Sequence, residues 1–181
     1  MSRTSVYLVS LLIIFQSSLL AYSSNPKDFV NELVTDAISK LSDINLNKDQ
    51  KVSFIEKVAL EHVDINALGL YTLGELRKSS TEDDISNYKN AFEKYFLKSL
   101  TSRLNDYSSS KFEITGEDKK SANYTIVNSM VRPEDGGPNI KIDWRVYTKD
   151  PDKPLIRDLI VEGLSLARTQ KEEFSSILSS N

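Results

Sequence analysis

The sequence predicts an α+β domain, in which several helices pack against a curved, four-stranded antiparallel sheet. The hydrophobic period changes near Lys111, from the 3.6 residues of a helix to the two residues of a strand. The strand-like segments after this point are separated by short turn signals, which indicates an antiparallel meander. Helices and strands also form two blocks rather than alternating, and this order is typical of α+β folds.

The N-terminal residues predict a secretory signal peptide over residues 1–23, followed by one domain over residues 24–181. Arg3 precedes an uncharged apolar stretch, and Ala21 and Ser23 after it give a small-x-small cleavage site. The alternative is a membrane anchor, because the apolar stretch is close to the ~17 residues that can span a bilayer. No Cys follows the stretch, so a lipoprotein anchor is not expected.

Charge and cysteine content narrow the class of partner. The chain has 23 Lys and Arg against 26 Asp and Glu, and losing Arg3 with the signal peptide leaves 22 basic residues and a formal net charge of −4. An acidic domain without a basic stripe is not expected to bind nucleic acid. The chain has no Cys and hence no disulfides, which fits the bacterial periplasm better than a disulfide-rich extracellular setting.

Four helices are predicted before the strands. The first is capped by Asn25 and repeats apolar residues at helical spacing as far as Leu41. A second begins near Asp49, and Asp64 is expected to cap a third. The fourth, near residues 82–106, is the clearest, because acidic residues in its first turn and basic residues further on both suit the helix dipole.

Four strands are predicted, over residues 111–118, 122–132, 139–148 and 154–162. The third alternates most cleanly, with Ile140, Ile142, Trp144 and Val146 on one face and Lys141, Asp143, Arg145 and Tyr147 on the other. A meander buries one face and leaves the other in water, so the apolar set should face the helices. After the last strand, Gly163 is expected to turn the chain into a closing helix that covers the sheet's apolar face.

Catalytic chemistry has little support in the sequence. One His and no Cys leave no Cys–His pair and no His-based metal cluster, and His62 is expected to be an ordinary surface or interface residue. Asp158 and Glu162 share a strand face, but at ~3.3 Å per residue they lie about 13 Å apart. Paired carboxylates of glycosidases are only ~5–9.5 Å apart. The sequence therefore predicts no enzyme, no metal site and no cofactor.

Several short segments occur in the order of a known family. They are Leu73-Gly74 followed by Arg77, Trp144-Arg145 in the third strand, and VEGLSLARTQKEEFSSIL at residues 161–178. On these residues the chain resembles the MlaC family of periplasmic phospholipid-binding proteins, also described as toluene-tolerance auxiliary proteins. The resemblance covers nearly all of the predicted mature chain. It departs from the family at Leu76, where an aromatic residue usually precedes the Arg.

The resemblance implies a periplasmic carrier that holds a phospholipid by its acyl chains in an apolar cavity between sheet and helices. The carrier, a monomer, would shuttle lipid between an outer-membrane lipoprotein complex and an inner-membrane ABC-type transporter with a membrane-anchored substrate-binding ring, and so maintain outer-membrane lipid asymmetry. Arg77 and Arg145 are expected to contact the headgroup or a partner. The residues expected to line the cavity are Leu68, Tyr71, Leu73, Phe92, Phe96, Leu100, Ile126, Met130, Ile142, Trp144, Val146, Val161 and Leu166.

The alternative is an exported interaction module of similar fold that has a packed core and binds no ligand. The same apolar residues would then fill the space between the long helix and the sheet, because sequence alone does not separate a dry core from a lipid cavity.

Overall fold

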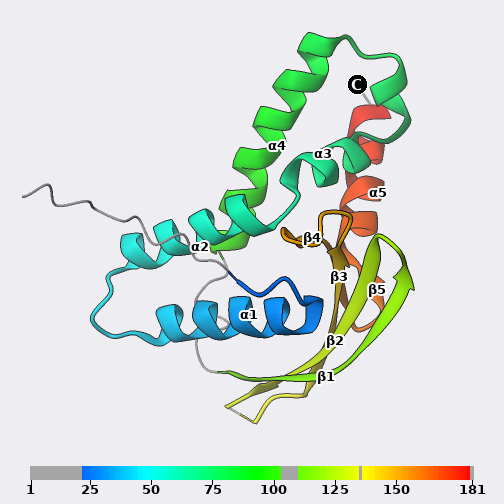
Figure 1. Cartoon of the computed structure of the whole chain (residues 1–181). Coiled ribbons are helices and arrows are strands. Elements are labelled where there is room, and N and C mark those ends of the chain that lie inside the picture. Colours follow the sequence, from blue (N-terminus) through cyan, green and yellow to red (C-terminus); the bar gives the residue numbers. More distant parts are fainter. Residues whose placement is uncertain (1–21, 103–109, 135, 180–181) are drawn as a thin grey trace, which may run out of the picture.

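The structure, a computed structural model, describes residues 22–102, 110–134 and 136–179. Within these residues, five α-helices and an antiparallel sheet make up the fold (Figure 1), which confirms the predicted α+β class. The helices are α1 (Pro26–Ser42), α2 (Lys48–His62), α3 (Ile65–Leu73), α4 (Glu82–Ser102) and α5 (Leu166–Ser179), with a 3-10 helix η1 (Gly74–Lys78) between α3 and α4. The strands are β1 (Ser110–Ser121), β2 (Tyr124–Pro133), β3 (Ile140–Tyr147), β4 (Leu155–Val161) and β5 (Leu164–Ser165). Among the helices of the described residues, none is long and apolar enough to cross a membrane.

The sheet is an antiparallel meander with the strand order β1-β2-β3-β4-β5. The fifth strand is a short addition to the four that were predicted. Glu162 and Gly163, with φ angles of 48° and 84°, form a two-residue turn between β4 and β5. Positive φ at both central residues is the backbone of a type I′ hairpin turn. Gly163 therefore closes a small hairpin, and the closing helix that was expected after it begins at Leu166.

The register divides the sheet into two faces, because directly paired residues of antiparallel strands point to the same side. Trp144 pairs with Val127 and Leu159, so these three share what we call the inner face. Arg145 pairs with Ile126 and Asp158 on the opposite, outer face. The predicted alternation of the third strand is confirmed.

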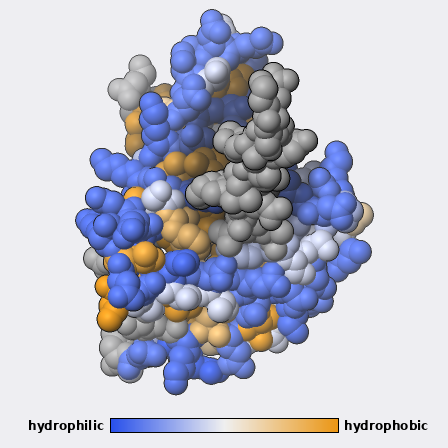
Figure 2. Space-filling view, turned by 60° about the vertical axis from the view of Figure 1, so that its left-hand side comes forward, coloured by the Kyte–Doolittle hydropathy of each residue, from blue (hydrophilic) through white to orange (hydrophobic). Residues whose placement is uncertain are grey.

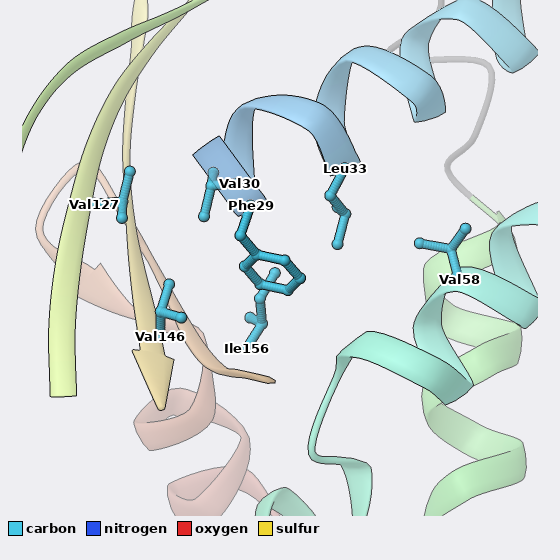
Figure 3. Close-up of a cluster of buried hydrophobic side chains, with 7 residues drawn as sticks. All are labelled: Phe29, Val30, Leu33, Val58, Val127, Val146 and Ile156. Carbon is cyan, nitrogen blue, oxygen red and sulfur yellow. The ribbon is translucent and has the colours of Figure 1, made fainter. Parts of the chain in front are cut away.

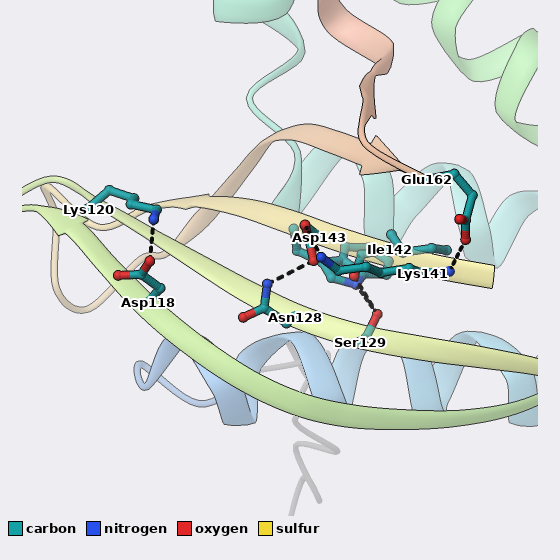
Figure 4. A network of polar contacts seen from close by, with 9 residues as sticks. Asp118, Lys120, Asn128, Ser129, Lys141, Ile142, Asp143 and Glu162 are labelled. Atoms are coloured by element: carbon teal, nitrogen blue, oxygen red, sulfur yellow. Dashed lines mark hydrogen bonds and ion pairs between the residues drawn. The ribbon is translucent and has the colours of Figure 1, made fainter. Parts of the chain in front are cut away.

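The outer face carries a network of polar side chains (Figure 4). The amide Nδ2 of Asn128 donates to Asp143 Oδ1 over 2.8 Å, and Lys141 Nζ lies 3.3 Å from Asp143 Oδ2. Lys141 also donates its backbone N–H to the Glu162 carboxylate beside the hairpin turn. Polar pairing of this kind is typical of the wet face of an antiparallel sheet.

The helix that covers the inner face is α1, and the sheet curls around it (Figure 1). Phe29, Val30 and Leu33 of α1 pack on Val127, Val146 and Ile156 of the strands, with Val58 of α2 completing the cluster (Figure 3). We call these seven residues the core cluster. Full burial of each such side chain contributes about 1.5–3 kcal/mol. The prediction that the closing helix covers this face was wrong, because α5 leaves the sheet beside β4 and packs mainly on α3.

The long helix α4 packs mainly on α3 and α2 rather than on the strands. Its buried residue Phe92 stacks on Phe96, with ring centroids 6.2 Å apart, and meets Phe174 of α5 edge-on. A Cβ at Gly69 would lie 3.1 Å from Phe92 Cδ1, so the glycine lets α3 approach α4 closely. Helices α3, α4 and α5 thus form an aromatic cluster of their own, separate from the core cluster.

Ser129 links two residues of the inner face. Its hydroxyl donates to the Ile142 carbonyl over 2.8 Å and accepts the indole N–H of Trp144 over 2.9 Å, with Ser129 itself fully buried.

We expect Ser129→Ala to lower the free energy of unfolding by about 1–2 kcal/mol, because it leaves the Trp144 N–H without this acceptor. Chemical denaturation followed by the emission of Trp144, the sole Trp of the chain, measures the change. Ser86→Ala on the exposed side of α4 is the control and should stay within about 0.5 kcal/mol. Equal stability of the two variants would mean that the Ser129 hydroxyl contributes nothing.

Candidate functional site

The inner face of the sheet has a fully buried part and a half-buried part. Val127, Val146 and Ile156 are at most 5% exposed, because α1 and α2 cover them. The other part is apolar but only half-buried, and we call it the apolar belt. It consists of Ile142, Trp144, Leu159 and Val161.

Apolar side chains of the helices are also left partly open to solvent. Leu68 of α3 and Phe96 of α4 are half-buried, and Leu100 of α4 and Leu60 of α2 are 37% and 51% exposed. Figure 2 shows apolar side chains gathered in a recess across the middle of one face, at the height of α2 and the lower end of α4. An apolar recess framed by polar surface is typical of a binding site for an apolar ligand.

The structure brings only some of the predicted lining residues together. Ile142, Trp144 and Val161 lie on the belt, whereas Val146 shares their face but belongs to the packed core cluster. Phe92 lies in the aromatic cluster, and Leu73 is also buried. Tyr71 and Leu166, at 41% and 48% exposed, lie on the surface of α3 and at the start of α5.

Ile126 and Met130 do not lie with the other predicted lining residues. Ile126 pairs with Arg145 and Met130 with Lys141, so both side chains are on the outer face. The prediction failed because Thr125, Ile126 and Val127 are all buried, and an apolar run on both faces hides the period of two. A choice one residue out moves a whole strand to the wrong face.

Two residues of β1 escaped the sequence analysis. Phe112 and Ile114 are half-buried and pack against the core cluster, and the Phe112 ring meets Trp144 edge-on at 6.2 Å. Phe112 and Ile114 are two residues apart in the first predicted strand, and this spacing could have indicated that both face the helices. They extend the apolar surface from the belt toward the edge of the sheet.

The family model described as MlaC protein matches residues 27–181. The chain belongs to the MlaC family. None of the curated proteins is similar enough to count as a match. Among solved structures, the chain is similar to the phospholipid-binding protein from Ralstonia solanacearum in complex with a phospholipid, with a TM-score of 0.68 and 17% identity over 83% of this chain and 86% of the other.

In this member of the MlaC family, Arg145 is held by a contact on the outer face. Its Nη1 lies 3.7 Å from Oδ2 of Asp158, whose side chain is 1% exposed. Asp158 also accepts from the Ser165 hydroxyl at 2.7 Å and from the Ala167 N–H at 3.0 Å, so it caps the start of α5. Asp158 is thus a structural, hydrogen-bonding group.

We expect Arg145→Glu to lower the free energy of unfolding by about 2 kcal/mol, because it replaces an ion pair beside a buried carboxylate with a like charge. Thermal unfolding checks this, with Lys149→Glu at an exposed position as control. Arg145→Gln should cost less than Arg145→Glu. If Arg145→Glu and Lys149→Glu have the same melting temperature, the contact between Arg145 and Asp158 does not stabilise the protein.

Arg77 is exposed and lies in η1, between α3 and α4. The belt residues, in contrast, belong to β3 and β4. Near η1, a surface hollow of about 520 Å³ lies between α3 and α5, lined by Tyr71, Arg168, Lys171, Glu172 and Ser175. The Lys171 amine sits 5.1 Å from the Tyr71 ring centroid. Tyr71 therefore faces a surface hollow lined mostly by charged residues rather than the apolar belt.

His62 lies among aromatic rings. Its ring centroid is 4.7 Å from that of Tyr22 and 5.7 Å from that of Phe29. His62 therefore packs against other rings of the domain, and the sequence had left a surface and an interface position open. Within the part of the chain that the structure describes, no three His, Asp or Glu side chains come close enough together to hold a metal ion.

Proposed function

We propose that this protein is a periplasmic carrier that binds a phospholipid by its acyl chains along the apolar belt. The observation that carries the proposal is the apolar belt, whose side chains stay half-buried beside a core cluster that is fully buried. Its support is membership of the MlaC family and the fold shared with a protein whose structure holds a phospholipid. The lining set proposed is Leu68, Phe96, Leu100, Ile142, Trp144 and Val161.

The physical reason for a carrier is the cost of exposing acyl chains to water. Each buried CH₂ contributes about 0.8 kcal/mol, so two ordinary chains represent on the order of 20 kcal/mol. A protein that covers the chains removes this barrier to transfer. Because the bound acyl chains are so costly to expose, release of the lipid into water is slow. Unloading therefore requires direct transfer to a second apolar binding site.

That requirement favours membrane complexes as partners. In the proposal the carrier acts as a monomer without a cofactor, and it exchanges lipid between an outer-membrane lipoprotein complex and an inner-membrane ABC-type transporter with its membrane-anchored substrate-binding ring. Export to the periplasm would depend on the predicted N-terminal signal peptide. No reaction is part of this function.

Native mass spectrometry tests the proposal on the exported protein purified from bacteria in mild conditions. The carrier should show added mass of one phospholipid that disappears after extraction with organic solvent. A bare chain in both preparations would contradict the carrier and favour the ligand-free interaction module. Turnover of an ester or glycoside by the extracted protein would instead favour an enzyme.

A second readout is the emission of Trp144, which lies on the belt. Adding phosphatidylglycerol or phosphatidylethanolamine vesicles to the extracted protein should shift this emission to the blue, because acyl chains would replace water around the indole. Unchanged emission at saturating lipid would contradict binding at the belt.

A further inference from the structure

The surface hollow between α3 and α5 lies outside the apolar belt and has a different lining. Its α5 wall consists of Arg168, Lys171, Glu172 and Ser175, whose spacing places them on one face of the helix. Tyr71 of α3 forms the other wall, and the two helices pack side by side (Figure 1). The volume of about 520 Å³ lies within the ~300–1,000 Å³ typical of small-molecule sites.

The three charged side chains of this hollow do not neutralise one another. Of the ion pairs among the residues that the structure describes, none involves Arg168, Lys171 or Glu172. Arg168 and Glu172 are four residues apart on α5, but a helical pair with the basic residue first is the less favourable order. The hollow therefore offers two cations and one carboxylate to a ligand.

Lys171 is held in place without an ion pair. It is half-buried, and its amine lies 5.1 Å from the centroid of the Tyr71 ring, within the range of a cation–π contact. Gly74 is buried with a φ of 62°, and a Cβ there would lie 3.3 Å from Lys171 Cε. Glycine suits this backbone conformation and leaves room for the lysine stem. Holding the side chain in advance lowers the entropy that binding a ligand costs.

The charges of the hollow fit a ligand that carries both a phosphate and an ammonium group. A phosphodiester has two non-bridging oxygens, which can accept charge-assisted hydrogen bonds from Arg168 and Lys171 together. Glu172, one helical turn from Arg168, can then pair with the ammonium group. A phosphate alone would be repelled by the Glu172 carboxylate. A primary ammonium also donates hydrogen bonds to a carboxylate, which a quaternary ammonium has no N–H to do.

We propose that this hollow binds a phosphoethanolamine group, with the phosphate between Arg168 and Lys171 and the ammonium beside Glu172. The same group occurs in the headgroup of phosphatidylethanolamine and in free glycerophosphoethanolamine. The inference rests on the proposed function for the first source, since the lipid is then the one that the carrier holds. In that case the hollow gives the carrier a headgroup preference that a belt for acyl chains cannot provide.

Isothermal titration calorimetry with glycerophosphoethanolamine tests the proposal on the exported protein after extraction of its lipid. The protein should bind this probe, and Arg168→Gln and Lys171→Gln should each weaken binding about tenfold. Glu172→Gln should weaken binding of this probe by a similar factor but not that of glycerol phosphate, which has no ammonium group. Lys57→Gln, at an exposed position of α2, is the matched control and should bind like the unchanged protein.

Two results would overturn the proposal. One is the absence of binding to the unchanged protein, and the other is equal affinity in Arg168→Gln and Lys57→Gln. Arg168 and Glu172 are exposed, so their variants should melt within about 2 °C of the unchanged protein, and weaker binding then reports on the hollow and not on unfolding.

Native mass spectrometry of the same variants distinguishes the two sources of the group. If the hollow holds the headgroup of the carried lipid, Arg168→Gln should lower the proportion of phosphatidylethanolamine relative to phosphatidylglycerol in the co-purified lipid. An unchanged proportion, with the probe still bound by the unchanged protein, assigns the hollow to the free compound. Probe binding without co-purified lipid refutes only the carrier, whereas co-purified lipid without probe binding refutes only the role of the hollow.

Discussion

Replacing Asp64 with alanine is expected to lower the free energy of unfolding by about 3–4 kcal/mol. Asp64 Oδ2 lies 2.6 Å from Nη2 of Arg157 and accepts from its Nε over 2.8 Å, a two-point contact between side chains only 17% and 25% exposed. Removing one partner leaves the other charge half-buried and without its carboxylate. Asp64 Oδ1 also accepts the Ala67 N–H over 3.1 Å, so the variant loses the cap of α3 as well.

The size of this effect follows from what the pair connects. Arg157 is the extra residue of a bulge in β4, since Asp158 pairs with Arg145 and Ile156 with Val146. Its Nη1 donates to the Tyr124 hydroxyl over 2.8 Å, and its guanidinium carbon lies 3.4 Å from the centroid of the Tyr147 ring. The pair therefore joins the corner between α2 and α3 to three strands of the sheet.

The control is an ion pair on the exposed surface. Lys78 and Glu75 are in contact in η1 with side chains 69% and 80% exposed, so Glu75→Ala should change the free energy of unfolding by less than about 0.5 kcal/mol. Urea denaturation measures both variants. Asp64→Asn separates the two roles, because an amide oxygen can still cap α3. A loss no larger for Asp64→Ala than for Glu75→Ala would show that the pair does not stabilise the corner.

Local elements of the fold could be predicted well because their signals are local. Asn25 and Asp64 cap α1 and α3 with their side chains, as the sequence indicated. The clearest helix begins at Glu82 as predicted, while its predicted end at residues 103–106 lies outside the described residues. A helix cap depends on atoms within three residues, so it can be read without knowing the rest of the fold.

Which helix covers the sheet could not be predicted in the same way. A periodic apolar stripe shows which side of a helix is buried but not against what, and both α1 and α4 carry such a stripe. Phe29 and Val30 of α1 meet the strands, whereas Phe92 of α4 meets Phe96 and Phe174. The choice depends on shape: the aromatic side chains of α4 stack with other rings beside Gly69, whereas Phe29, Val30 and Leu33 of α1 fit the curved sheet.

The candidate site shows the same division. Ile142 and Trp144 were assigned to the correct face of the sheet because β3 alternates without a break, and Ile126 was assigned to the wrong face because β2 is apolar on both sides. Val146 and Ile142 lie on the same face of β3, but Val146 is buried under α1 and Ile142 is only half-buried. Which of the two is buried depends on how far α1 extends over the sheet. That boundary is a tertiary property, and no pattern within the strand encodes it.

This boundary leads to a prediction for two tryptophan substitutions on the same face of β3. Val146 is fully buried in the core cluster, so Val146→Trp overpacks it at a cost of about 1–3 kcal/mol or more. The melting temperature should fall by about 3–10 °C. Ile142, four residues earlier on the half-buried belt, has room for the larger ring on its open side. Ile142→Trp should therefore change the melting temperature of lipid-free protein by less than about 2 °C.

The lipid content of the two variants should show the opposite order. Ile142→Trp fills space that the acyl chains would occupy, so co-purified phospholipid should fall several-fold, as native mass spectrometry would show. Val146→Trp should keep most of its lipid for as long as it stays folded, because its side chain lies behind the belt in packed core. Lys149→Trp, at an exposed position just after β3, controls for the added ring. If Ile142→Trp keeps its full lipid load and melts as early as Val146→Trp, the belt is dry core and the acyl chains do not bind there.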